Sequence, residues 1–283
     1  VNDKYEVNES DVRVHGFVGK DMESFYLKTD LSFDYFKKSR ANYELFSSNT
    51  DLSRHIINVV PMIQLKNEKA RLNLGVDLAL EKNLESEIHL FPKVDFSLPI
   101  AENIFYLFAN VSGGVVKNNF LTMALENPFV NSTVQPMNTI NKIELKGGMN
   151  GSFSSRVSFL AFVKYSSFDR LQLYYNDSIS SNKFNTLYTN GKVLNIHGEL
   201  TYRAGEKFEA SVHIDQYKYS LDFSQKAWHH PNTEVKFSAK YNLRDKLYID
   251  GALFGRGSYY VRIQELNEKK KKSIKGYVDG NLG

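Results

Sequence analysis

The sequence contains no cysteine, and only six of its 283 residues are proline. The lack of cysteine rules out disulfide bonds and suits an envelope protein that avoids stray oxidation, although it is equally common in cytosolic proteins. No run of 18 or more uncharged apolar residues is present, so no transmembrane helix is expected. A membrane-spanning strand needs an apolar side chain only at every second position, so this absence and a mean hydropathy of −0.40 do not exclude such strands.

The chain has little excess charge of either sign. Lysine and arginine total 36 against 32 acidic residues, which gives a net charge of +4. The lysines are spread along the chain and form no basic stripe, so no nucleic-acid partner is expected. The first residues lack the charged and apolar regions of a signal peptide, which is expected of a mature chain or of one without its signal.

Alternation of apolar and polar residues runs through most of the chain and predicts β-strands. The clearest example is the stretch 69–98, and no segment of comparable length has helical spacing. We therefore expect an all-β fold, an antiparallel meander of about 13 strands. These strands are predicted over residues 11–19, 23–37, 55–65, 69–81, 87–98, 103–117, 139–150, 155–167, 190–203, 207–221, 233–243, 246–262 and 272–283.

The lengths of the strands and of their connections favour a transmembrane β-barrel over a soluble sandwich. Many runs exceed the five or six residues of a typical globular strand, while a tilted membrane strand needs roughly nine to eleven. Short connections also alternate with long ones, as expected for turns at one rim of a barrel and loops at the other. Short connections are predicted near 20–22, 66–68, 99–102, 152–154, 203–206 and 244–246, and long ones near 38–54, 118–138, 168–189, 222–232 and 263–271, with 82–86 breaking the pattern.

The final stretch, KGYVDGNLG, alternates to its end. A strand edge in lipid cannot be left unpaired, because every backbone polar group there needs a partner. We therefore expect residues 1–283 to be a single transmembrane β-barrel domain that lacks its closing C-terminal strands, with about 14 to 16 strands in the intact protein.

Two hairpins allow the strand register to be predicted. A three-residue loop at Arg244 to Lys246 would pair Leu243 with Leu247. It would also set residues of opposite charge against each other, Lys240 with Asp250 and Glu234 with Arg256. The segment TYRAGEKFEA similarly suits a three-residue loop with Gly205 in the left-handed conformation. That register places His197 opposite Ser211 and Asn195 opposite His213.

Candidate chemistry is concentrated on one polar face of the second hairpin. Its residues are Asn195, His197, Glu199, Ser211, His213 and Asp215. Acid, base and nucleophile types together resemble a hydrolase site, but any polar lumen brings such residues together, so no catalytic residue is assigned. His229 and His230 are expected to be solvated loop residues, because no third ligand follows at a recognised spacing, and no metal or other cofactor is expected.

The polar face of the predicted barrel should line a watery interior with charges of both signs. Its lumen-lining residues are predicted to be Lys69, Arg71, Asp77, Lys93, Asp95, His197, His213, Lys240, Asp250 and Arg256.

Three stretches of the second half carry a family resemblance: ENPFVNS (126–132), AWHHPNTEVKFSAKYNLRDKLYIDGALFGRG (227–257) and GYVDGNLG (276–283). They resemble the C-terminal barrel region of TonB-dependent-receptor-like outer-membrane proteins of Bacteroidetes. The resemblance implies an outer-membrane barrel in which further strands follow VDGNLG. The N-terminal plug and energy-coupling box of true TonB-dependent receptors have no counterpart in the sequence, so active import is not implied.

These patterns together predict a porin- or receptor-like outer-membrane protein that is not an enzyme, and that passes or binds a solute or anchors a surface complex. Outer-membrane lipid, lipopolysaccharide and subunits of such a complex are the expected partners. The run NEKKKKS (267–273) could meet lipopolysaccharide phosphates, although a solvated turn is the simpler interpretation. Two alternatives stay open: an outer-membrane barrel hydrolase that uses the Ser/His/Asp cluster, and a soluble β-sandwich that binds lipid.

Overall fold

The computed structural model describes residues 8–39, 52–65, 70–83, 85–101, 104–177, 182–222, 226–243, 246–265 and 268–282. In these ranges the chain forms one large antiparallel sheet, a separate hairpin and one short helix. The elements in chain order are β1 (Glu9–Asp21), β2 (Phe25–Lys38), β3 (Leu52–Leu65), β4 (Arg71–Lys82), β5 (Ser86–Ala101), β6 (Phe105–Val116), α1 (Phe120–Glu126), β7 (Thr139–Ser154), β8 (Val157–Asn176), β9 (Phe184–Ala204), β10 (Phe208–Leu221), β11 (Thr233–Leu243), β12 (Leu247–Arg256), β13 (Tyr259–Glu265), β14 (Glu268–Ile274) and β15 (Tyr277–Leu282).

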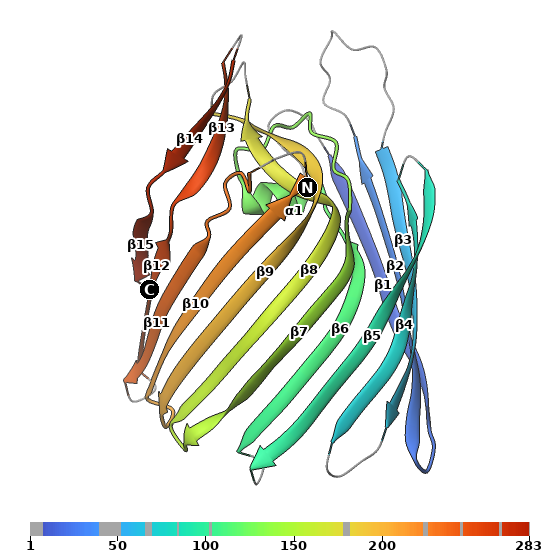
Figure 1. The fold of residues 1–283 in the computed structure, drawn as a ribbon, viewed down its shortest axis with the longest axis vertical. Coiled ribbons are helices and arrows are strands. Elements are labelled where there is room, and N and C mark those ends of the chain that lie inside the picture. Colours follow the sequence, from blue (N-terminus) through green and yellow to red (C-terminus); the bar gives the residue numbers. More distant parts are fainter. Residues whose placement is uncertain are drawn as a thin grey trace.

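The large sheet is a meander of 13 strands, and β1 to β12 follow in sequence order before β15 completes it. The strands are inclined to the long axis of the molecule, and the sheet curves so that α1 lies on its concave side (Figure 1). The predicted all-β antiparallel meander is therefore confirmed. Its large sheet has the 13 strands expected, and the hairpin of β13 and β14 brings the described strands to 15. The large sheet is continuous, and the described residues do not form the two packed sheets of a sandwich.

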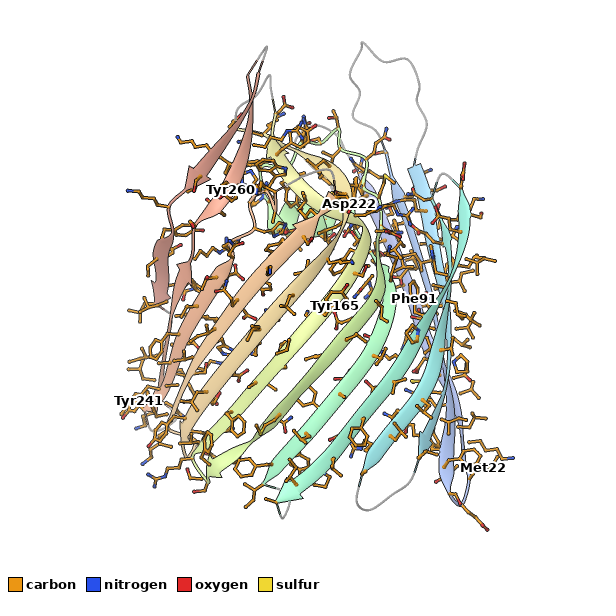
Figure 2. The ribbon with its side chains drawn as sticks, viewed as in Figure 1. Met22, Phe91, Tyr165, Asp222, Tyr241 and Tyr260 are labelled. Carbon is orange, nitrogen blue, oxygen red and sulfur yellow. The ribbon has the colours of Figure 1, made fainter. Side chains whose placement is uncertain are left out.

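Short and long connections lie at opposite rims of the sheet. Met22, in the turn after β1, and Tyr241, near the turn after β11, lie at one rim, while Asp222 and Tyr260 lie at the other (Figure 2). The connection between β4 and β5 breaks the alternation, as predicted. At the short-turn rim, Phe153 stacks on Phe159 with ring centroids 4.6 Å apart, and Phe105 contacts both rings.

The two faces of the sheet differ sharply in polarity. On the convex face, apolar side chains such as Val14, Leu78 and Leu253 are 44–60% exposed. On the concave face the alternate positions are polar or charged, and many of these side chains are half-buried. Buried apolar residues gather where the segment after β6 packs against the concave side, so the hydrophobic core is small and local. No helix in the described ranges is long and apolar enough to cross a membrane.

Four predicted elements have wrong boundaries, and one of them is the strand predicted at 272–283, which is split between the end of β14 at Ile274 and the start of β15 at Tyr277. The loop predicted at 168–189 is mostly strand, because β8 and β9 continue past a bulge at Phe168 to Leu171. The strand predicted at 246–262 is broken after Arg256: β12 pairs with β15, whereas β13 leaves the large sheet to pair with β14. Part of the loop predicted at 263–271 is therefore a hairpin. A Cβ at Gly276 would lie only 2.5 Å from the Arg256 carbonyl oxygen, so glycine permits the close chain crossing there.

Candidate functional site

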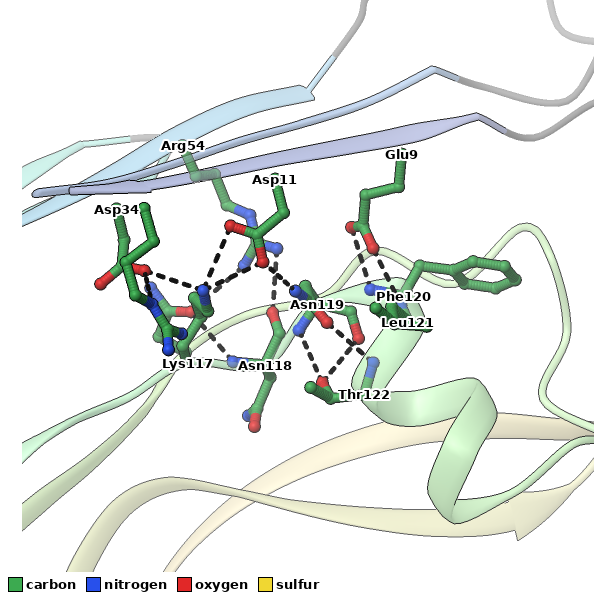
Figure 3. A network of polar contacts seen from close by, with 12 residues as sticks. Glu9, Asp11, Asp34, Arg54, Lys117, Asn118, Asn119, Phe120, Leu121 and Thr122 are labelled. Carbon is green, nitrogen blue, oxygen red and sulfur yellow. Dashed lines mark hydrogen bonds and ion pairs between the residues drawn. The ribbon is translucent and has the colours of Figure 1, made fainter. Parts of the chain in front are cut away.

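The segment 117–138, between β6 and β7, lies on the concave side of the sheet and contains α1 (Figures 1 and 3). Its own sequence starts the helix. Asn119 is the N-cap, and its side-chain oxygen accepts a hydrogen bond from the Thr122 backbone N–H at 2.8 Å. The Thr122 hydroxyl in turn accepts from the Asn119 N–H at 3.0 Å, which completes a capping box.

A carboxylate from the first strand also caps this helix. Glu9 of β1 accepts hydrogen bonds from the backbone N–H groups of Phe120 and Leu121, each at 2.9 Å. These N–H groups have no partner within the helix, and the helix N-terminus favours negative charge. Glu9 is only 5% exposed, so the contact ties β1 firmly to the segment.

The segment 117–138 also carries a small apolar core. Phe120, Met123, Val130 and Val134 cluster with Tyr174 of β8, and each is at most 8% exposed. The hydroxyl of Tyr174 donates to Glu126 at 2.9 Å. The segment is therefore packed against the wall of the barrel as well as hydrogen-bonded to it.

Charged side chains hold the first residue of the segment. The Lys117 ammonium lies 3.0 Å from Asp11 of β1 and 2.8 Å from Asp34 of β2 (Figure 3). Asp34 also pairs with Arg13 at 2.7 Å, and Asn119 donates to Asp11 at 3.0 Å. The side chain of Lys117 is 12% exposed, so this ion pair is shielded from water more than a surface pair would be.

A buried network holds both ends of the segment. Asn138 donates to Glu81 of β4 at 2.8 Å, and Arg170 of β8 pairs with Glu81 at 2.6 Å. Arg54 of β3 donates to the Asn118 carbonyl at 2.9 Å and lies over the ring of Phe36, 4.3 Å from its centroid. Arg54 and Glu81 are each 1% exposed. The network links strands far apart in the sheet through one inner segment.

The described residues of the predicted lumen-lining set alternate with the exposed apolar positions and so share the polar face of the sheet, while their role as the lining of a lumen stays a prediction. Arg71 and Asp95 border a hollow of about 390 Å³ together with Asn73, Asn110 and Lys146. Asp250 is opposite Lys240 in the register, and Arg256 lies 3.4 Å from Glu234. The predicted register of this hairpin is therefore confirmed. Lys69 lies outside the described residues.

The register predicted for the β9–β10 hairpin is wrong by four residues. Gly205 is left-handed as predicted, with φ +58°, but the strands close at the Ala204–Phe208 pair and not two residues earlier. His213 therefore lies opposite Glu199, and His197 opposite Asp215. Asp215 accepts from Asn195 at 2.9 Å and lies 2.9 Å from His197 Nδ1. The corrected register brings both histidines to carboxylates.

A serine hydrolase site is not complete in this cluster. Ser211 Oγ lies 3.2 Å from His213 Nε2, and His213 Nδ1 lies 3.4 Å from Glu199, which is the order of a Ser-His-acid relay. Acyl transfer also needs N–H donors for an oxyanion. Ser211 lies within ladders to both β9 and β11, which use the backbone N–H groups around it. The geometry does not favour the hydrolase alternative.

His229 and His230, predicted to be solvated, are instead packed at the long-loop rim. The ring of His229 meets Phe184 at 5.1 Å and Tyr259 at 6.2 Å between centroids. Burial, together with the neighbouring imidazole, lowers the pKa of His229 to about 4, and burial also lowers the pKa of His230. The correction arises because β13 covers the loop, which the sequence could not show.

No protein-family model matches the sequence, and no curated protein matches it. Solved structures do share the fold. The siderophore receptor PirA from Acinetobacter baumannii superposes with a TM-score of 0.67 at 10% identity, over 100% of this chain and 49% of that chain. The FrpB iron transporter from Neisseria meningitidis gives 0.65 at 10% identity, over 98% and 48%. The copper transporter OprC gives 0.62 at 11% identity, over 98% and 48%.

These similarities identify the fold as that of the outer-membrane β-barrel receptors and transporters. The chain spans about half the length of the structures that it matches. The expected antiparallel meander of an outer-membrane barrel fold is therefore confirmed. Closure into a single barrel domain and the assignment to Bacteroidetes stay predictions.

Proposed function

We propose that this chain is part of an outer-membrane barrel of the receptor type, which binds or passes a solute through a polar lumen narrowed by the segment 117–138. The observation that carries the proposal is the polarity of the two faces. A convex face of exposed apolar side chains suits lipid, and a concave charged face suits a watery interior. Strands of 10 to 21 residues in β1 to β12 are long enough to span a bilayer.

The lumen in this proposal is lined by the charged concave face. Its lining includes Arg71, Asp77, Lys93, Asp95, His197, His213, Lys240, Asp250 and Arg256. The segment 117–138 would restrict passage, since it is held across the concave side by Glu9, Asp11, Asp34 and Glu81. Such a lumen favours a polar solute.

Closure of the barrel belongs to the same proposal. In the described sheet β1 pairs only with β2, and β15 only with β12. Strand edges in lipid need hydrogen-bonding partners, so further strands would pair with the free edges of β1 and β15 and close the sheet into a single barrel domain. The resemblance to TonB-dependent-receptor-like proteins supports closure by further strands. A second role of the same barrel, as a membrane-anchored scaffold for a surface complex, would not require an open lumen. Lipopolysaccharide would meet the long-loop rim.

Membrane extraction is the first test of this function. The protein should partition with outer membranes and need detergent for release, and recovery as a soluble monomer would contradict the proposal.

In planar bilayers the wild-type protein should conduct poorly. The double variant D11N/D34N should conduct several-fold more, because Lys117 loses both carboxylate partners.

The matched control is Arg203→Gln. Arg203 pairs with Glu209 at 2.6 Å at the opposite rim, and its side chain is 61% exposed. This variant should conduct like the wild type. Equal conductance of the wild type and D11N/D34N would show that the segment does not restrict the lumen.

A further inference from the structure

We propose that His197, Glu199 and His213 form a binding site for a divalent transition-metal ion on the concave wall of the barrel. The three side chains come from β9 and β10, and one ligand atom from each lies within 4.8 Å of the other two. His213 Nδ1 is 3.4 Å from Glu199 Oε2, and His197 Nε2 is 3.9 Å from it. Ligand atoms on one tetrahedral zinc lie roughly 3.4 Å apart, because each bond is about 2.0–2.1 Å.

The hydrogen bonds around the cluster are compatible with one tautomer of each histidine that presents a ring nitrogen to a metal. His197 donates its Nδ1–H to Asp215 at 2.9 Å, so Nε2 keeps its lone pair. His213 Nε2 lies 3.2 Å from Ser211 Oγ, which lies 2.8 Å from Ser238 Oγ. In the His213 tautomer that carries its proton on Nε2, this nitrogen donates to Ser211, Ser211 donates to Ser238, and Nδ1 keeps its lone pair for a metal. Both free nitrogens are the ones that face Glu199.

A supporting shell also holds each ligand in place. Asn195, which is 3% exposed, donates to Asp215, and Thr201 donates to the other oxygen of Glu199 at 3.2 Å. Phe162 stacks on the ring of His197 with centroids 4.5 Å apart. Carboxylate–histidine–metal arrangements of this kind fix the tautomer and raise the basicity of the ligand.

The charges around the cluster suit a dication. Glu199 and Asp215 supply two negative charges to offset an ion of charge +2. Lys236 lies opposite His213 in the register, but its ammonium group is directed toward β12, where it lies over the ring of Phe254 at 5.4 Å from the centroid. Two imidazoles and one carboxylate without a thiolate suit Zn²⁺, Ni²⁺, Cu²⁺ or Fe²⁺, and three protein ligands leave a coordination position open.

A second cluster, of two carboxylates and one imidazole, is a poorer site. Glu81, Glu87 and His89 also lie within reach of one another. Arg170 already pairs with both carboxylates, at 2.6 and 3.2 Å, so an ion would have to compete with a guanidinium. Replacement of its histidine, His89, therefore serves as a comparison in the test below.

The proposed metal site does not depend on whether a solute passes through the barrel.

Zinc titration of the detergent-solubilised protein, with a competing chelator, tests the proposal. One equivalent should bind. His197→Gln and His213→Gln should each weaken binding at least about tenfold. Asp215→Asn, which removes the carboxylate that orients His197 and one negative charge beside the ion, should weaken it by about 10–100-fold. His15→Gln should bind as the wild type does, because His15 faces only Asp30 at 4.0 Å.

Co²⁺ gives a second readout, since its visible absorption reports nitrogen and oxygen ligands directly and should change in His213→Gln. If that variant does not fold, Glu199→Gln, of similar volume, takes its place. The proposal is overturned if the wild type takes up no zinc, if uptake survives loss of both histidines, or if His89→Gln abolishes it.

Discussion

Replacing Glu81 by alanine is expected to lower the free energy of unfolding by about 3–5 kcal/mol. Glu81 is 1% exposed, and its carboxylate meets Arg170 at 2.6 Å, Asn138 at 2.8 Å and His89 at 3.4 Å. Its removal leaves buried donors without their acceptor, which costs more than the ion pair itself contributes. Denaturant unfolding in lipid vesicles measures the loss.

The matched control is Glu209→Ala. Glu209 also pairs with an arginine at 2.6 Å, but its side chain is 39% exposed. Water and salt screen such a pair, so we expect a loss below about 1 kcal/mol. Equal losses for the two variants would show that the network around Glu81 does not hold the inner segment to the wall.

Replacing Val76 by arginine should destabilise the protein by about 2–4 kcal/mol. Val76 lies midway along β4 on the convex face and is 38% exposed, so in water the change would cost little. In a bilayer the same position places the guanidinium near the hydrocarbon midplane. The effect should therefore appear in lipid vesicles as reduced folding yield and a lower unfolding midpoint.

Asn73→Arg is the control for this prediction. Asn73 lies on the concave face of the same strand, opposite Asp95 in the register, so an added guanidinium meets a carboxylate and water. We expect a change below about 1 kcal/mol. If Asn73→Arg proved the more damaging of the two, the proposed orientation of the sheet would be wrong.

Regular alternation made most of the sheet predictable, because a period of two fixes which side chains share a face. The β11–β12 register followed from charge pairing at Glu234 and Arg256. The continuation of β8 was missed because Arg170, with φ +56°, lies in a bulge that breaks the alternation. The β9–β10 register was missed because a turn centred two residues later keeps the same polar face and shifts every pair by four.

The structure of the segment 117–138 could not be predicted from its local sequence pattern. Helix α1 has seven residues, too few to show a helical period, and its cap uses Asn119 with Thr122 where the usual signature has Glu or Gln. Its anchors are distant in sequence: Glu9 caps residues more than 110 positions away. Charged residues near strand ends, such as Asp11 and Arg54, were the available signal for this segment. The neighbouring sequence, however, does not predict which residues they contact.

The central claim is that the convex face meets lipid and the concave face meets water. The absence of native cysteine allows single spin labels to be placed at each position from 72 to 80 of β4 in lipid vesicles. Collision rates with oxygen, which concentrates in lipid, and with a water-soluble paramagnetic reagent should alternate with a period of two. We expect oxygen maxima at Leu72, Leu74, Val76, Leu78 and Leu80, whereas uniform access of the water-soluble reagent along the strand would contradict a lipid-facing convex side.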